Sequence, residues 1–291
     1  MAKQNLGSWI IFIALSFIWG SSFILMKLGL RGLSAVQVAS LRIIFSALFL
    51  IPLSVISFST LPKNKWFPVF FSGLLGSLLP AYLFCIAEQG IDSALAGTLN
   101  SLTPIFVIIT GALFFGIKAS SNKISGILIA LTGSFLLFLS QPANSEHQNL
   151  LYVGYVLIAT FCYGLNVNLV HKYLHGVPSL QIAALALTLN AIPATIVLAA
   201  SGYFSSDFSE VEFIKANAYA ALLGIAGTAI ASVIFYKLIK TAGVVFASLV
   251  TYGIPFVACM WGLFLGEEIG WKQWGSLVVM LSGVYLANRN R

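Results

Sequence analysis

Apolar runs of about 20 residues, the length of α-helix that crosses a bilayer core, follow one another along the whole chain. Short polar segments separate them, and several runs carry internal Gly or Pro, which membrane helices tolerate. Ten runs can be marked, at residues 8–29, 35–57, 66–88, 93–115, 122–140, 150–172, 178–201, 216–238, 243–265 and 272–288. The pattern predicts an all-α membrane protein with ten transmembrane helices.

The first half of the chain recurs in the second half at a nearly constant separation. Matching pairs include Phe17/Phe161, Gly20/Gly164, Gln37/Gln181, Gly73/Gly224, Gly76/Gly227, Phe84/Phe235 and Pro104/Pro255. Ordered matches of this kind indicate an internal duplication. We therefore predict a five-helix repeat at residues 1–140 and a second at 150–291. Because five is odd, the second copy enters the membrane upside down, which gives two inverted repeats.

The charges give the predicted orientation. With the N-terminus inside, ten of the fifteen basic residues fall on the inner side: Lys3, Lys63, Lys65, Lys118, Lys123, Lys172, Lys237, Lys240, Arg289 and Arg291. All eight acids fall on or near the outer side: Glu88, Asp92, Glu146, Asp207, Glu210, Glu212, Glu267 and Glu268. A basic excess marks the cytoplasmic side. We expect a bacterial inner-membrane protein with both termini cytoplasmic.

Composition excludes several classes of protein. With 59% hydrophobic and 8% charged residues, the chain is not a soluble domain. The net charge of +7 is scattered between apolar runs, which favours membrane lipids as partners over nucleic acid. Cys85, Cys162 and Cys259 lie inside apolar runs, and His171 and His175 lack an evident third ligand. We expect no metal and no cofactor.

Inverted repeats are typical of membrane transporters that bind substrate near the bilayer midplane, so polar and aromatic residues repeated at mid-span are the candidates for such a site. Trp19 and Ser22 share one face of the first span, because they are three residues apart. Tyr163 and Asn166 occupy the matching places in the sixth span. The alternative for these residues is hydrogen bonding between helices.

Two prolines interrupt the fourth and ninth spans and are predicted to kink them. Pro104 releases the carbonyl of Asn100, and Pro255 releases that of the residue beside Tyr252. A freed carbonyl beside polar side chains suits a binding or hinge feature, so Asn100 and Tyr252 are further substrate-site candidates. The alternative is a kink that only shapes packing.

Arg42 lies inside the second span and Glu88 near the outer end of the third. An ionisable residue within a membrane helix is a functional hypothesis by default. We predict that the two form a charge pair on the outer side, which acts either as a gate or as a structural ion pair.

Several short motifs occur together in order: Trp19-Gly20-Ser21-Ser22, Leu41-Arg42, Pro104-Ile105-Phe106, Pro255-Phe256 and Leu265-Gly266-Glu267. Together they resemble the EamA-type branch of the drug/metabolite transporter superfamily, over essentially the full chain. The resemblance implies a ten-helix, inverted-repeat carrier of small metabolites, often an exporter of amino acids. The halves differ where Ile117 matches Glu267 and Ala186 matches Arg42, so any role of that acid or arginine is one-sided.

Three classes of function can be compared. Motifs of a hydrolase, a zinc protease or a phosphate-binding loop are missing, and a scaffold does not require inverted halves. A secondary carrier requires both inverted halves and polar residues at mid-depth. Because Arg42 is the only basic residue well within a span, we predict a neutral or zwitterionic small-molecule substrate such as an amino acid. Export follows from the resemblance, a monomer is favoured over a dimer, and a carrier for lipophilic cations is the alternative.

Overall fold

The computed structural model describes residues 6–91, 93–117, 119–140, 150–264 and 270–288. Its elements are α1 (Leu6–Gly29), α2 (Ala35–Thr60), η1 (Lys63–Lys65), α3 (Trp66–Gly73), η2 (Leu74–Leu78), α4 (Leu79–Ala87), α5 (Ser93–Asn100), α6 (Thr103–Thr110), η3 (Gly111–Phe115), α7 (Ser121–Leu139), α8 (Leu150–Tyr173), α9 (Ser179–Ala200), η4 (Tyr203–Ser205), α10 (Val211–Gly224), η5 (Ile225–Ile230), α11 (Ala231–Ala242), α12 (Val244–Ser248), η6 (Leu249–Tyr252), α13 (Gly253–Phe264) and α14 (Trp271–Asn288). Of the residues discussed above, Lys3, Asp92, Lys118, Glu146, Leu265, Gly266, Glu267, Glu268, Arg289 and Arg291 lie outside these ranges, as does the side chain of Cys259.

Within the described ranges the chain is helical and contains no strand. Eight stretches there are long and apolar enough to cross a membrane: Leu6–Gly29, Ala35–Thr60, Lys63–Ala87, Leu95–Phe115, Ser121–Leu139, Leu151–Tyr173, Ser179–Ala200 and Val211–Ala242. A further apolar helical stretch, Val244–Val257, is shorter. Helices suit a bilayer because they satisfy their backbone hydrogen bonds internally. The chain is an integral membrane protein.

Four of the spans change from one type of helix to another part-way along. The third and eighth contain π-helical turns, η2 and η5, and each turn begins directly after one of the matched glycines Gly73 and Gly224. The fourth span is interrupted between α5 and α6, just before Pro104. At this interruption the hydroxyl of Thr103 donates to the carbonyl of Asn100 at 2.8 Å. The ninth narrows to the 3-10 turn η6 ahead of Pro255. These changes of winding bring irregular backbone next to the space between the halves.

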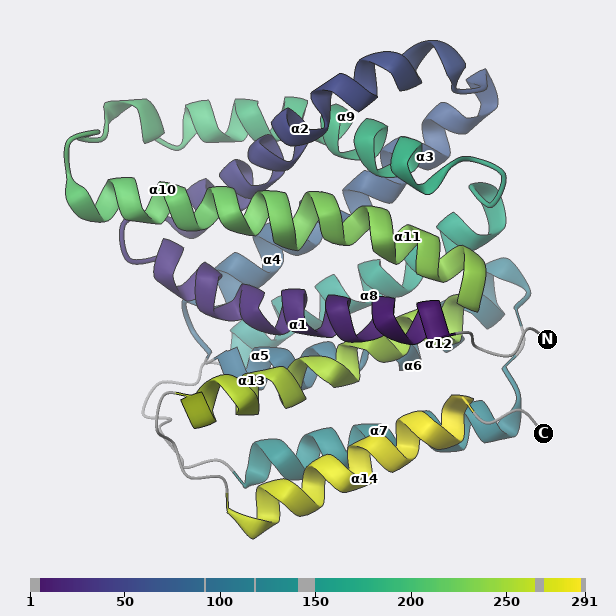
Figure 1. The fold of residues 1–291 in the computed structure, drawn as a ribbon. Helices are drawn as coiled ribbons and strands as arrows, with labels where there is room; N and C mark the ends of the chain where they lie inside the picture. Colours follow the sequence, from purple (N-terminus) through teal and green to yellow (C-terminus); the bar gives the residue numbers. More distant parts are fainter. Residues whose placement is uncertain (1–5, 92, 118, 141–149, 265–269, 289–291) are drawn as a thin grey trace.

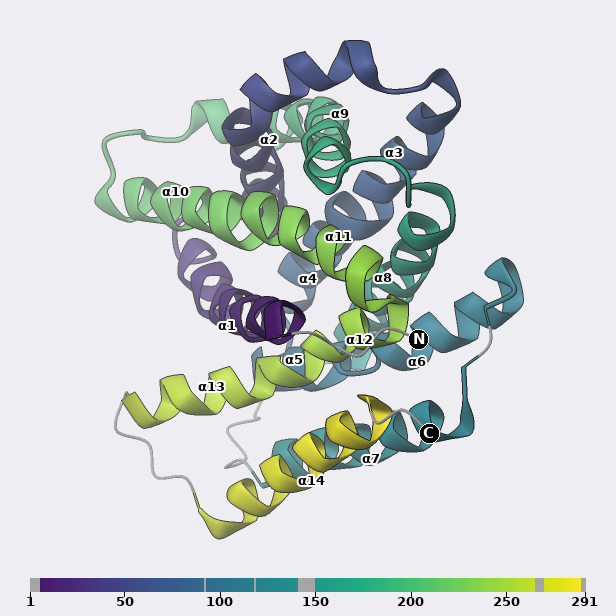
Figure 2. The ribbon, with the colours of Figure 1, turned by 45° about the vertical axis from the view of Figure 1, so that its right-hand side comes forward.

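Helices from the two halves of the chain pack against each other in matched pairs. The helices α7 and α14 lie side by side at the lower edge of Figures 1 and 2, and α2 packs against α9. A methyl group added at Gly133 would overlap the backbone of Met280, and one added at Gly283 would overlap that of Ala130. Glycine at these two matching positions therefore allows α7 and α14 to approach closely.

Matching residues of the two halves make reciprocal contacts, each with the opposite half. The side-chain amide of Gln37 donates to the carbonyl of Ser201 at 3.3 Å. Its match, Gln181, donates to the carbonyl of Ser57 at 3.1 Å, and Ser57 is the match of Ser201. The two bonds tie the start of α2 to the end of α9 and the start of α9 to the end of α2. Whole helices also make reciprocal contacts. The first helix of the first half, α1, packs on α11 and α13 of the second half, and its match α8 packs on α4 and α6 of the first half.

Candidate functional site

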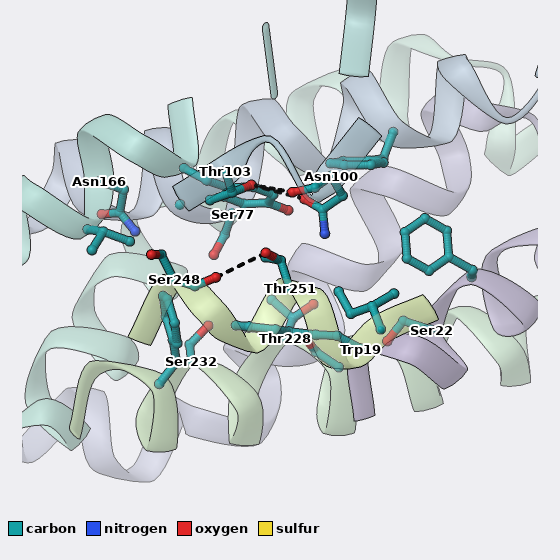
Figure 3. Close-up of a pocket in the computed structure, with 18 of the residues that line it drawn as sticks. Trp19, Ser22, Ser77, Asn100, Thr103, Asn166, Thr228, Ser232, Ser248 and Thr251 are labelled. Atoms are coloured by element: carbon teal, nitrogen blue, oxygen red, sulfur yellow. Dashed lines mark hydrogen bonds between the residues drawn. The ribbon is translucent and has the colours of Figure 1, made fainter. Parts of the chain in front are cut away.

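A cavity of about 100 Å³ lies between the two halves. Since roughly 10–15 Å³ of such volume holds one water molecule, a small solute fits. Residues from both halves line it: Trp19, Ser22, Phe23, Met26, Arg42, Gly76, Ser77, Phe84, Asn100, Thr103, Tyr163, Asn166, Val167, Gly227, Thr228, Ser232, Phe235, Tyr236, Ser248, Thr251 and Ile254. Figure 3 shows its polar side chains converging from several helices.

Aromatic residues of the cavity wall also contact the opposite half in matching ways. The indole Nε1 of Trp19 donates to the carbonyl oxygen of Gly227 at 3.1 Å, and the ring packs edge-on against Phe235 at 5.0 Å. On the matching side, Tyr163 stacks on Phe84 with the ring centroids 6.1 Å apart. Trp19 and Tyr163 thus present flat apolar surfaces to the cavity from the two halves.

Ser22 and Asn100 line the cavity from α1 and α5. The Ser22 hydroxyl donates to the carbonyl of Ile18 at 2.8 Å, which leaves its oxygen free to accept another hydrogen bond. Asn100 accepts at its Oδ1 from the Thr103 hydroxyl at 3.3 Å. Figure 3 shows the amide nitrogen of Asn100 pointing into the space between the helices. The two residues therefore offer a solute one acceptor and one donor.

Asn166 is the most deeply buried of the predicted site residues that line the cavity, with 2% of its surface exposed. Its side chain lies against Gly76, where a methyl group would overlap the amide. Its Oδ1 is buried and has no hydrogen-bond partner in the described ranges. Figure 3 shows the amide nitrogen, rather than this oxygen, on the side of the other labelled residues.

Arg42 also lines the cavity, and its Nε donates to the hydroxyl of Thr228 at 3.0 Å. Glu88, at the end of α4, accepts from the Ser93 hydroxyl at 3.0 Å. Within the described residues no ion pair joins Arg42 to Glu88, so the predicted charge pair is not formed in this structure. The Thr228 hydroxyl provides the guanidinium with a neutral partner instead.

Tyr252 lies outside the cavity. It is fully buried, and its hydroxyl donates to the carbonyl of Ile127 on α7 at 3.0 Å. The 3-10 winding of η6 changes the direction in which successive side chains point. Thr251, one residue earlier, lines the cavity instead. The hydrogen bond of Tyr252 therefore connects the ninth span to α7.

Sequence reasoning missed several polar residues that line the cavity. Ser77 and Thr228 both line it and directly follow the matched glycines Gly76 and Gly227. Their position next to a repeated glycine was the available signal. Ser232 and Ser248 had no comparable signal, because neither follows a repeated glycine.

Metal binding has no support in the described part of the chain. No group of three His, Cys, Asp or Glu side chains is close enough there to hold an ion. His171 and His175 lie near each other, with ring centroids 6.2 Å apart. The cavity instead combines hydroxyls, amides and aromatic rings with a single guanidinium, which suits non-covalent binding of a small solute.

Comparison with known proteins agrees with this architecture. The sequence model of the EamA-like transporter family matches residues 7–139 and 150–289, which is one copy in each half. An uncharacterized transporter of Archaeoglobus fulgidus is 26% identical over 97% of this chain and 99% of its own length. A probable amino-acid metabolite efflux pump of Escherichia coli is 24% identical over 88% of this chain and 77% of its own. One solved crystal structure matches with a TM-score of 0.73 at 14% identity, over 98% of this chain and 97% of that one, which shows a shared fold.

Proposed function

Because the chain belongs to the EamA-like transporter family, we propose that it is a secondary carrier that exports a small neutral or zwitterionic metabolite, such as an amino acid. The observation that supports the substrate class is the cavity between the halves. Its walls combine aromatic rings with amides and hydroxyls, and Arg42 is its one guanidinium among the described lining residues. Export is supported by the likeness to the Escherichia coli efflux pump.

The proposal treats the chain as ten crossings in two inverted halves. The ninth crossing is α12, η6 and α13, and the tenth is α14. Support comes from the exchanged contacts, since Gln37–Ser201 and Gln181–Ser57 lie at opposite ends of the α2–α9 pair. The start of α1 and the end of α14 also lie on the same side of the molecule, at the right of Figure 1, as an even number of crossings requires.

The orientation proposed is a bacterial inner membrane with both termini in the cytoplasm. Basic residues from different segments of the chain, η1 and the end of α8, lie at one end of the helices. The Nζ of Lys65 donates to the carbonyl of Tyr173 at 2.7 Å, and the Nζ of Lys172 donates to that of Phe115 at 3.2 Å. A basic excess of this kind marks the cytoplasmic side.

The mechanism proposed is alternating access. Rocking of one half against the other would open the cavity to one side and then to the other. The contacts that change are those across the cavity, such as Trp19 with Gly227, while the close pairs α7–α14 and α2–α9 hold the halves together. Substrate shifts the population between the two forms and moves down its own gradient.

A carrier for lipophilic cations is the competing proposal. Such a substrate would be stabilised by an acidic side chain in the cavity, and Asp and Glu are not among the described lining residues. The positive charge of Arg42 further disfavours a cation. The zwitterionic substrate is therefore the better match.

Counterflow in proteoliposomes tests the proposal. Vesicles loaded with an unlabelled amino acid should accumulate the same labelled amino acid only when they contain the protein. Labelled leucine, phenylalanine, threonine and alanine form a suitable panel. Counterflow of none of these, together with movement of a cationic dye such as ethidium, would replace the proposal by its competitor.

A further inference from the structure

The guanidinium of Arg42 is held in place by one of its nitrogens only. Its Nε donates to the Thr228 hydroxyl at 3.0 Å, and that hydroxyl donates in turn to the carbonyl of Leu223 at 3.3 Å. This chain of bonds fixes the side chain against the π-helical turn η5. The two terminal nitrogens of Arg42, which carry four N–H donors, make no hydrogen bond within the described residues.

Arg42 lines a cavity that has no opposite charge among its described lining residues. A guanidinium inside a membrane protein is costly unless an anion or several hydrogen bonds stabilise it. Its planar fork fits a carboxylate in a bidentate manner, through two parallel N–H···O bonds. An anionic group bound in the cavity would therefore balance the positive charge of Arg42.

The other described lining residues suit the uncharged part of such a solute. The rings of Trp19, Phe84 and Phe235 form an apolar lining, and Ser22 and Thr251 add hydroxyl groups.

We propose that Arg42 binds the carboxylate of the transported solute through its terminal nitrogens. The proposal rests on the proposed carrier function and narrows its substrate to compounds that carry a carboxylate. A free amino acid meets this requirement. An amide or ester of the same amino acid lacks the anionic group and is a poor substrate.

The decisive measurement compares acids with their amides. Counterflow of labelled leucine, phenylalanine and threonine is measured in proteoliposomes at pH 7.4, and unlabelled competitors are added. The competitors are the amino acid, its amide and the matching acid without the amine. The wild-type protein should require about tenfold more amide than amino acid for equal inhibition, as expected for loss of a bidentate charged pair. The acid without the amine should inhibit better than the amide.

Variants then assign this preference to Arg42. In Arg42→Gln the ratio of inhibitory concentrations for amide and amino acid should fall towards one, and Arg42→Lys should retain part of it. The ratio does not depend on how much protein is folded. Arg31→Gln removes an exposed arginine at the end of α1 and should keep the wild-type ratio.

The outcomes separate the two proposals. Counterflow with equal inhibition by amide and amino acid in the wild type, or an unchanged ratio in Arg42→Gln, overturns carboxylate binding and leaves the carrier function intact. Counterflow of no amino acid in the panel contradicts the proposed substrate class, and carboxylate recognition fails with it.

Discussion

The side-chain amide of Gln37 donates to the carbonyl oxygen of Ser201 at a distance of 3.3 Å. The matching pair, Gln181 and Ser57, repeats this bond at 3.1 Å at the other end of the same two helices. Each bond joins residues from different halves, so neither half can form it alone. This exchange is the clearest structural trace of the duplication, and the predictions below depend on the packing that it describes.

The α7–α14 contact should be sensitive to the size of one glycine. Replacing Gly283 by alanine places a methyl group against the backbone of Ala130, whereas alanine at Gly275 on the same helix meets nothing within 4 Å. We expect Gly283→Ala to destabilise the protein by about 1–3 kcal/mol, as overpacking does. Thermal unfolding of the purified protein in detergent measures this. Equal unfolding temperatures for Gly283→Ala and the control Gly275→Ala would contradict the close packing.

Two asparagines on α8, two residues apart, should have separable roles. The amide nitrogen of Asn168 donates to the carbonyl of Val107 at 2.8 Å and to the hydroxyl of Thr110 at 2.9 Å, which ties α8 to α6. Asn168→Ala should therefore lower stability by about 1 kcal/mol. Asn166, unlike Asn168, is among the described residues that line the cavity, so Asn166→Ala should reduce transport with a smaller loss of stability.

Unfolding temperature and counterflow rate, both measured on each asparagine variant, separate these effects. The rates are compared at equal amounts of folded protein. A larger loss of stability in Asn166→Ala than in Asn168→Ala would mean that Asn166 is a structural residue.

The hydrogen bond from Trp19 to Gly227 should contribute to transport. Phenylalanine at position 19 keeps an aromatic ring beside Phe235 but removes the N–H donor. We expect Trp19→Phe to slow counterflow about two- to tenfold, which corresponds to the loss of one hydrogen bond. The control is Trp9→Phe, because Trp9 packs on Phe246 outside the cavity. Identical rates for both variants would show that the indole N–H has no part in the cycle.

Arg42 and Glu88 should act independently of each other. Each has its own hydroxyl partner, Thr228 and Ser93 respectively. A double-mutant cycle with Arg42→Gln and Glu88→Gln, read out as counterflow rate, should give a coupling energy below about 0.5 kcal/mol. A coupling of 1 kcal/mol or more would restore the charge pair predicted from sequence, formed in another state of the transport cycle.

Much of the fold could be predicted because bilayer length and duplication are both visible in the sequence. The partners in the α2–α9 and α7–α14 pairs are matching helices of the repeat, but the repeat alone does not show that they pack on each other. The π-helical turns η2 and η5 could not be predicted, because an extra residue in a turn leaves no mark in hydrophobicity. Proline was an incomplete guide, since Pro52 and Pro193 lie inside the unbroken helices α2 and α9.

The site was predictable where residues share a helical face in a regular helix. Trp19, Ser22, Tyr163 and Asn166 on α1 and α8 all line the cavity, as does Asn100. Tyr252 was predicted from the carbonyl freed by Pro255, which does not show where a neighbouring side chain points, and the chain forms a 3-10 turn there. The partner of Arg42 was also hidden, since Thr228 reaches it only through the packing of η5 on α2.

The inverted arrangement of the halves is tested most directly by the side on which two matching loops are exposed. Asn64 and Ser205 are exposed residues in η1 and η4, the loops after α2 and α9. Asn64→Cys and Ser205→Cys are made separately after the three native cysteines are replaced by alanine, and cells are treated with a membrane-impermeant maleimide. We predict labelling of Ser205→Cys in intact cells and of Asn64→Cys only after permeabilisation. Labelling of both in intact cells, or of neither, would contradict the inverted repeat.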